Sequence, residues 1–300
     1  MKKILVIGSV SIDLITKVKI IPKENEVAIS EGLLMNIGGK ATNGAIGLAR
    51  LLNEVFICGC IGDDTLKNLV IDTFNYEKIN ISSLETNSVH PTGTVLVNVD
   101  EKGNNTIIVN EDANLLLSKN TITKAITEDL DAVYITLELK PEIIEYALIN
   151  TFKNSIPILL DAAPQVWQLD KTFYKYITFL TANEYEAYKM TGIKISDLDS
   201  AKLALNKLRD DGGRNIIITF GDKGVFALEE NSNEILYREV VKVEVIDSTG
   251  AGDAFRAGFL TKYLETKDFN KSIEFENLCG SLAVTKLGSY KSMPNLSEVR

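Results

Sequence analysis

Histidine is nearly absent from this sequence, and long apolar runs are absent altogether. The only histidine among the 300 residues is His90, so a hydrolase of the Ser–His–Asp type would depend on that residue alone, and we do not favour it. The longest apolar runs, such as 55–61 and 216–220, have the length of a β-strand and are far shorter than a membrane span. The N-terminal run is interrupted at Gly8 and Ser9 and shows no cleavage-like site. It therefore predicts a first β-strand rather than a signal peptide.

Basic residues and cysteines are also few. The 32 Lys and Arg residues stand against 41 Asp and Glu residues, and the net charge of −9 disfavours nucleic acid and anionic membranes as partners. The odd number of cysteines suits a reducing compartment, so we expect Cys58, Cys60 and Cys279 to be buried thiols of a cytoplasmic protein. A chain of this length buries enough surface to fold without disulfides or a structural metal.

Apolar runs of strand length alternate with segments of helical periodicity along nearly the whole chain. Such alternation predicts an α/β protein, in which helices cover both faces of a mostly parallel sheet in three α/β/α layers. We expect strands at 3–7, 55–61, 132–136, 156–160, 177–180 and 215–220. We expect helices at 41–52, 65–74, 141–150, 184–191, 198–210, 251–264 and 272–286.

Two segments interrupt this alternation. Segment 11–36 has no helical period, and segment 92–109 contains two strand-like runs joined by a turn at Gly103. We expect both segments to form antiparallel strands outside the main sheet, as a small β lid. Because no linker separates two large blocks of sequence, we expect a single domain over 1–300 that carries this lid.

The most specific motif is DSTGAGDAF at 247–255, between an expected strand and an expected helix. Gly250 and Gly252 permit a tight turn and a close approach of the backbone to a ligand. Because the first amides of a helix lack partners within it, the amides of Gly250, Ala251, Gly252 and Asp253 are suited to stabilise a phosphoryl group in transfer. The Asp253 carboxylate is placed to accept a proton from an attacking hydroxyl; the alternative is a helix cap after a glycine turn.

A second glycine-rich loop, NIGGKATNG at 36–44, precedes another expected helix. Its glycines admit a ligand close to the backbone, and Lys40 and Asn43 offer donors to hydroxyl groups, whereas the spacing of a Walker phosphate loop is missing. With both motifs present, the sequence resembles the ribokinase family, the carbohydrate kinases of the phosphofructokinase-B type, over nearly the whole chain. The resemblance implies an ATP-dependent sugar kinase with Asp253 as the base.

The resemblance also implies further ligand-binding positions, each by its match to the family pattern. The positions implied for the sugar are Ser11, Asp13, Gly39, Lys40, Asn43, Glu138 and Asp253. Those implied for ATP are Asn183, Thr219, Gly221, Gly224, Gly252 and Asn277. Glu186 is implied for the Mg²⁺ shell, and a K⁺ site is implied at Asp247, Thr249, Ala283, Lys286, Gly288 and Ser292, mainly through carbonyl groups. The resemblance further implies a homodimer in which two lids clasp each other.

The sequence departs from the ribokinase pattern at three places. Ser11 stands where ribokinases usually carry Asn, segment 161–164 reads DAAP where they usually read NPAP, and Arg256 stands where many members carry a small or amide residue. The first departure shortens a polar side chain at the expected sugar site. The other two are interpreted as neutral tuning of the surroundings.

D-Ribose, phosphorylated on its 5-hydroxyl, is the first substrate expectation, and a fructokinase-like or nucleoside kinase is the alternative. Val95, Val97 and Val109 on the lid suit a small sugar better than a nucleobase. A catalytically silent sugar-binding regulator is the alternative from another class, but the loss of Asp253 or of its loop that would favour it is not seen. A nicotinamide dehydrogenase would need Gly-x-Gly-x-x-Gly after the first strand, where this chain reads GSVSID at 8–13.

Overall fold

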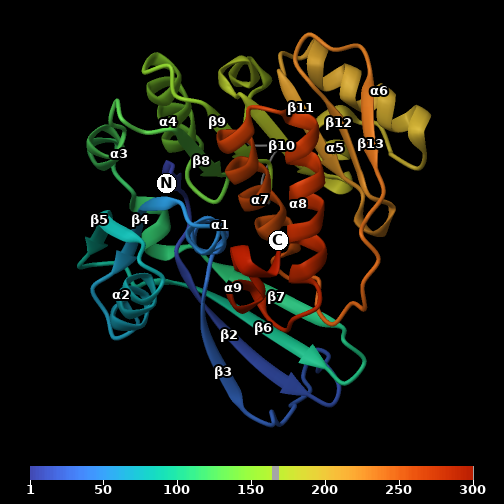
Figure 1. The fold of residues 1–300 in the computed structure, drawn as a ribbon. Helices are drawn as coiled ribbons and strands as arrows, with labels where there is room; N and C mark the ends of the chain where they lie inside the picture. The colour runs from blue at the N-terminus through green and yellow to red at the C-terminus, as the bar shows by residue number, and fades with distance from the viewer. Residues whose placement is uncertain (164–168, 300) are drawn as a thin grey trace.

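The computed structural model describes residues 1–163 and 169–299, and its centre is a nine-stranded sheet in the order β13-β12-β11-β10-β9-β8-β1-β4-β5 (Figure 1). Neighbouring strands from β11 to β5 are parallel, and β12 and β13 are added antiparallel at one edge. The strands are β1 Lys3–Ile7, β4 Glu54–Gly62, β5 Asn80–Asn87, β8 Ala132–Thr136, β9 Ile158–Asp161, β10 Phe179–Asn183, β11 Asn215–Thr219, β12 Val225–Leu228 and β13 Ile235–Arg238.

Helices cover both faces of this sheet, as expected. Successive side chains of a strand point to opposite faces, so Leu5 and Ile7 pack into one apolar cluster and Ile4 and Val6 into the other. The first cluster includes α3 Lys119–Ala125, α4 Pro141–Lys153, α5 Glu184–Thr191 and α6 Leu198–Asp210. The second includes α1 Lys40–Arg50, α2 Lys67–Tyr76, α7 Ala251–Thr266 and α8 Phe269–Ala283, and the short α9 Ser289–Ser292 lies near the end of the chain. The three-layer α/β/α prediction is therefore confirmed.

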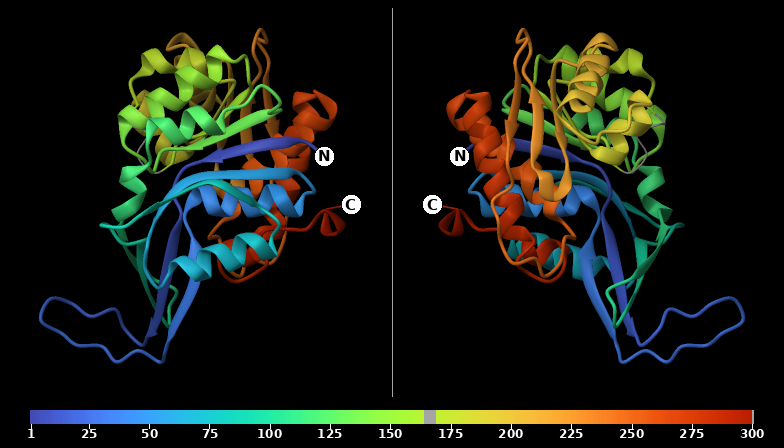
Figure 2. Two further views of the ribbon diagram at one scale, coloured as in Figure 1. Left: turned by 90° about the vertical axis from the view of Figure 1, so that its left-hand side faces the viewer. Right: turned by 90° about the vertical axis from the view of Figure 1, so that its right-hand side faces the viewer.

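The expected lid is a separate four-stranded sheet that projects from the body (Figure 2). Its strands, in the order β3-β2-β6-β7, are β2 Ser11–Val18, β3 Leu33–Gly38, β6 Gly93–Asp100 and β7 Asn105–Asn110. The central pair β2–β6 is parallel, so the expectation of antiparallel strands is wrong for that pair. Asp13, Val95 and Val109 are aligned in register across the lid, which puts these valines on the face that carries Asp13.

The elements missing from the sequence analysis are short, polar or both. β12 and β13 have four residues each, and β5 (NISSLETN) is an edge strand without a clear apolar alternation. The polar helix α3 was also not expected. The expected helix 272–286 instead runs from Phe269 to Ala283, because the Asp268 side chain accepts a hydrogen bond from Lys271 N–H and caps it three residues earlier.

The cysteines are buried and unpaired, as expected, and burial raises the pKa of the Cys58 thiol to about 12. In the described ranges, no helix is both long and apolar enough to cross a membrane. Pro164, part of one departure from the family pattern, lies outside the described residues.

Candidate active site

Polar residues gather where four neighbouring parallel strands end. Glu138 follows β8, Asp161 ends β9, Asn183 ends β10 and Thr219 ends β11, and these strands lie side by side in that order. Asn183 and Thr219 are directly opposite each other in the register of β10 and β11. The carboxyl ends of parallel strands share one edge, and open α/β sheets bind ligands at that edge. The sheet therefore assembles residues separated by up to 81 positions in sequence.

The start of α1 meets this edge through Gly39, Lys40 and Glu138. Gly39 has φ +92°, and a Cβ there would lie 2.6 Å from the Ser9 carbonyl oxygen, so only glycine fits the turn. The Glu138 carboxylate accepts hydrogen bonds from Lys40 N–H at 3.0 Å and from the Ser9 hydroxyl. Burial raises the pKa of Glu138 to about 7, and Lys40 and Ser9 partly oppose that rise. Glu138 thus neutralises the positive end of α1 from within the site.

The start of α7 carries the second glycine turn. Gly250 caps the helix with φ +82°, where the left-handed region again favours glycine. Ala251 N–H donates to the Ser248 carbonyl at 3.2 Å. Among the described residues, the amides of Gly250, Gly252 and Asp253 have no hydrogen-bond acceptor. Of the four amides expected to hold the phosphoryl group, only that of Ala251 is engaged within the described chain.

The Asp253 side chain lies between α1 and α7 and is only 4% exposed. Its Oδ2 accepts a hydrogen bond from Asn43 Nδ2 at 2.9 Å, and Lys40 Nζ lies 3.6 Å from Oδ1. Oδ1 is buried and accepts no hydrogen bond from the described part of the chain. Burial alone would lower the pKa of Lys40, but the carboxylates of Asp253 and Asp161 outweigh it and raise that pKa. One carboxylate oxygen is thus held in place while the other can receive a proton.

The lid supplies Asp13 and Ser11 to the same place. The Asp13 carboxylate lies directly against the Gly38 backbone, where a methyl group would overlap it. Burial raises the pKa of Asp13 to about 6, the Ser289 hydroxyl opposes this, and the negative charge of Asp253 adds to it. The buried Ser11 hydroxyl oxygen has no hydrogen-bond partner among the residues that the structure describes. These groups, with Glu138 and Asp253, form an acceptor-rich surface suited to sugar hydroxyls.

The residues expected to bind ATP lie around the ends of β10 and β11. Asn183 and Glu186 form a capping box at the start of α5: Glu186 N–H donates to Asn183 Oδ1 at 2.9 Å, and Asn183 N–H donates to Glu186 Oε2 at 2.8 Å. Gly221 and Gly224 both have positive φ in the turn after Thr219. Asn277 of α8 donates a hydrogen bond to the Glu239 carbonyl. The contacts of Asn183 and Glu186 are those of a helix cap, so their roles toward nucleotide and Mg²⁺ stay predictions.

The segments expected to hold K⁺ are joined by Asp247. Its two carboxylate oxygens accept hydrogen bonds from Thr249 N–H and Gly288 N–H, each at 2.9 Å. Burial would raise the pKa of Asp247, but hydrogen bonds outweigh it and lower that pKa below its ordinary value. Those from Thr249 have the larger effect, followed by that from Gly288 N–H. Ser292 is buried and its hydroxyl donates to the Ser289 carbonyl, whereas the Lys286 side chain pairs with Glu298 at the surface. Lys286 and Ala283 can therefore contribute only carbonyl groups.

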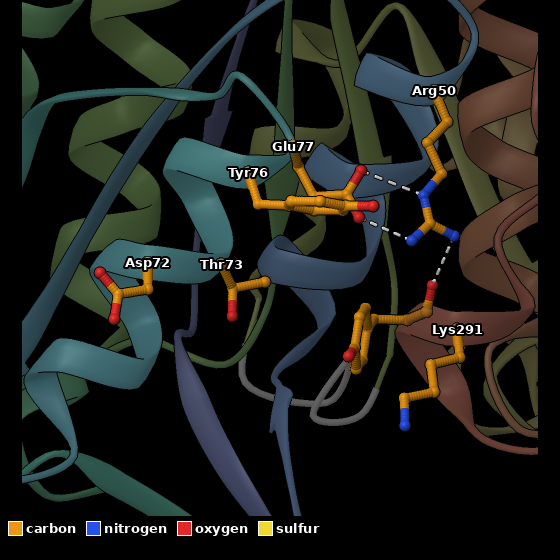
Figure 3. A pocket seen from close by; sticks show the side chains of 7 residues that line it. Arg50, Asp72, Thr73, Tyr76, Glu77 and Lys291 are labelled. Atoms are coloured by element: carbon orange, nitrogen blue, oxygen red, sulfur yellow. Dashed lines mark hydrogen bonds and ion pairs between the residues drawn. The ribbon is translucent and has the colours of Figure 1, made fainter.

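A hollow at the far end of α1 shows how this segment is braced (Figure 3). Arg50 forms two hydrogen bonds with the Glu77 carboxylate, at 2.6 and 3.1 Å. The same guanidinium donates to the carbonyls of Tyr290 and Met293 at 3.0 and 2.9 Å. Arg50 thus connects α1 and α2 to the chain around α9.

Two residues interpreted from the sequence as neutral prove to be part of the site. The guanidinium of Arg256 and the carboxylate of Asp161 form a buried ion pair at 2.8 Å. The signal in the sequence was that both positions depart from the family pattern, but only the fold shows that they touch.

Comparison with known proteins agrees with this geometry. The family described as pfkB family carbohydrate kinase matches residues 1–296. A ribokinase of Haemophilus influenzae is 31% identical over 99% of this chain and 97% of its own length. A deoxyribokinase of Salmonella typhi is 30% identical over 98% and 96%. The solved structure of Arabidopsis thaliana ribokinase complexed with ribose and ATP has a TM-score of 0.90 and 23% identity, and covers 99% of this chain and 97% of that one. The chain belongs to the pfkB family of carbohydrate kinases, phosphotransferases that act on an alcohol group.

Proposed function

We propose that this kinase is a ribokinase that transfers the γ-phosphoryl group of ATP to the 5-hydroxyl of D-ribose. The observation that carries the proposal is the Asp253 carboxylate, whose Oδ2 is held by Asn43 while its buried Oδ1 accepts no hydrogen bond within the described ranges. Relatives with the name ribokinase match over nearly the full chain, which supports this assignment. Because a deoxyribokinase is almost as similar, the choice between sugars depends on the site.

In the proposed reaction, Asp253 Oδ1 accepts the proton of the 5-hydroxyl as that oxygen bonds to the γ-phosphorus. The bond between that phosphorus and the oxygen bridging to the β-phosphate breaks, and ADP leaves. The free amides of Gly252 and Asp253, at the positive end of α7, stabilise the charge on the transferred group. Lys40, 3.6 Å from Oδ1, adds a positive charge beside the reacting atoms.

Recognition of the sugar is proposed to use Ser11, Asp13, Gly39, Asn43 and Glu138. The hydroxyl oxygen of Ser11 and Oδ1 of Asn43 are buried and have no hydrogen-bond partners in the described chain, so a sugar hydroxyl would give each a partner. A sugar with fewer hydroxyls leaves more of them unsatisfied. This favours ribose over 2-deoxyribose.

An ATP-consumption screen over ribose, 2-deoxyribose, fructose and ribonucleosides tests the substrate. We expect ribose to have the highest kcat/KM, at least about tenfold above 2-deoxyribose, which corresponds to about 1.4 kcal/mol. If fructose or a nucleoside exceeds ribose tenfold, the chain is a different kinase of the family. If 2-deoxyribose exceeds ribose, the chain is a deoxyribokinase.

Two cations are part of the proposal. Mg²⁺ bound with ATP would neutralise phosphate charge, and the buried Glu186 carboxyl in the first turn of α5 suits its outer shell. Burial and Asp161 raise the pKa of Glu186, and a nearby cation would lower it. K⁺ would be held near Asp247 by backbone carbonyls of 249 and 283–292. At saturating Mg²⁺, exchange of K⁺ for tetramethylammonium is expected to lower kcat about fivefold, which is about 1 kcal/mol. Unchanged kcat would remove the K⁺ site.

We further propose that residues 1–300 act as one kinase domain that dimerises through its lid. The loop between β2 and β3 extends away from the body (Figure 2) and exposes Val27 and Ile29 by 93% and 88%. The apolar edge strand β7 is exposed along its whole length. A second copy of the lid would cover both. Light scattering at micromolar concentration is expected to give twice the mass of 33.1 kDa, and a monomeric mass would contradict the dimer.

We also propose that the protein works in the cytoplasm, because its three unpaired thiols suit a reducing compartment.

A further inference from the structure

Arg256 connects the start of α7 to two strands of the sheet. It lies one turn after Asp253, and its side chain is only 5% exposed. Nη2 lies 2.8 Å from Asp161 Oδ1, and Nε donates to the Thr181 hydroxyl at 2.8 Å. Asp161 and Thr181 are opposite each other in the register of β9 and β10. The guanidinium therefore joins a helix to a fixed pair of neighbours in the sheet.

Asp161 connects this ion pair to Lys40. Its Oδ1 accepts from Arg256 and also from Ala163 N–H at 3.0 Å, so that oxygen is fully engaged. Its Oδ2 makes no hydrogen bond with residues 1–163 or 169–299 and lies 3.7 Å from Lys40 Nζ. Lys40 Nζ lies at nearly the same distance, 3.6 Å, from Asp253 Oδ1. The ammonium group therefore lies between two carboxylates, and Arg256 determines where one of them points.

The balance of buried charge makes Arg256 necessary for this arrangement. A buried carboxylate without a partner costs several kcal/mol, so an ion deprived of its partner recruits another. Without Arg256, Asp161 and Asp253 would share the positive charge of Lys40, and Asp161 is the less exposed of the two carboxylates. Lys40 would be drawn toward Asp161. Glu186 shows the same balance, because burial and Asp161 raise its pKa while Arg256 lowers it.

Arg256 also packs against the turn that presents the free amides. A Cβ added to Gly252 would lie 2.6 Å from Arg256 Nη1, so the guanidinium rests directly against this backbone. A shorter side chain at 256 would leave that contact unfilled.

We propose that Arg256 and Asp161 are positioning residues for phosphoryl transfer, whose ion pair holds the Lys40 ammonium midway between Asp161 and Asp253. The inference rests on the proposed role of Asp253 as the base. Asp161 and Arg256 are two of the departures from the ribokinase pattern. Because their side chains form an ion pair, each charge compensates the other, and we interpret the two departures as linked rather than as separate neutral changes.

The test is a cycle of Arg256→Asn, Asp161→Asn and the double variant, assayed on the best acceptor of the substrate screen. Arg256→Asn draws Lys40 toward Asp161, and Asp161→Asn leaves Arg256 without its ion-pair partner. We expect kcat per folded enzyme to fall about 10- to 100-fold in each, while the sugar KM stays within about threefold. The double variant removes both charges together and leaves Lys40 facing Asp253. We expect its kcat to return to within about fivefold of wild type.

The control is Arg214→Gln, which breaks the Arg214–Glu230 pair between β11 and the end of β12, away from the site. Its kcat is expected to stay within about twofold of wild type. Circular dichroism and thermal unfolding give the folded fraction, so lost stability is separated from lost turnover. Single variants that unfold more easily but keep kcat within threefold would show a purely structural pair. A double variant as impaired as the product of the singles would also overturn the proposal.

A second cycle keeps the proposal testable if a single variant does not fold. In a Lys40→Met background, Asp161→Asn should lower kcat by less than about twofold, because Asp161 acts through Lys40. A further tenfold loss there would overturn the proposal. Asp253→Asn in the wild-type background tests the base separately. If that variant retains activity while the two cycles behave as expected, the assignment of the base fails and the positioning of Lys40 stands.

Discussion

Asp253→Asn is expected to lower kcat by 10²- to 10⁴-fold, about 3–5 kcal/mol of barrier, with the sugar KM changed by less than about threefold. In the wild-type chain, Asn43 Nδ2 donates a hydrogen bond to Asp253 Oδ2 at 2.9 Å. Asparagine at 253 has nearly the same shape, and its carbonyl oxygen can accept the same hydrogen bond. It cannot take a proton at the position of Oδ1. The loss should therefore appear in turnover rather than in binding.

The competing interpretation of Asp253 as a helix cap makes the opposite prediction. Asn caps helices about as well as Asp, so an Asp253→Asn enzyme that only lost a cap would keep most of its kcat. Glu265→Gln, the same acid-to-amide change at an exposed position near the end of α7, is the matched control and should leave kcat within about twofold. A folded Asp253→Asn enzyme with more than about a tenth of wild-type kcat would contradict the base.

Gly38→Ala is expected to lower kcat/KM for the sugar about 100-fold, mainly through KM. The new methyl group would overlap the Asp13 carboxylate, which must then rotate away from the sugar hydroxyls it is proposed to bind. A 100-fold lower kcat/KM corresponds to about 2.7 kcal/mol, which is the size expected when charged hydrogen bonds to a ligand are lost. Gly38 does not have a positive φ, so the backbone accepts alanine. The free energy of unfolding should change by only about 1 kcal/mol.

Gly32→Ala is the matched control for this variant. Gly32 lies in the loop that leads to β3 of the same lid, and a Cβ there would meet no atom of the described residues within 4 Å. Its kcat/KM should stay within about twofold of wild type. Asp13→Asn should resemble Gly38→Ala in the sugar KM. An unchanged sugar KM in Gly38→Ala would mean that Asp13 is not a sugar ligand.

The parallel strands of the main sheet from β11 to β4 and both glycine turns were predictable from the sequence. Strands such as β1 (KILVI) and β11 (NIIIT) have apolar centres, and helices α5 and α6 were predicted over their full ranges, because burial imposes an apolar pattern that local sequence displays. The turn before α7 was equally visible, since its positive φ at Gly250 requires glycine. The edge strand β13 and its neighbour β12 were not predicted, because they follow β11 as antiparallel additions outside the alternation of strands and helices.

Which side chains share the site was decided by the tertiary structure. Asp253 is 210 positions from Asn43 and Asp161 is 95 positions from Arg256, yet each pair is in contact. The parallel pairing β2–β6 also joins lid segments that the sequence shows only as separate strands. Local sequence records whether a residue is buried and how its backbone turns. The partner of a buried charge depends on which strand ends and helix starts the fold brings to the same edge, so the ion pair of Arg256 and Asp161 became evident only there.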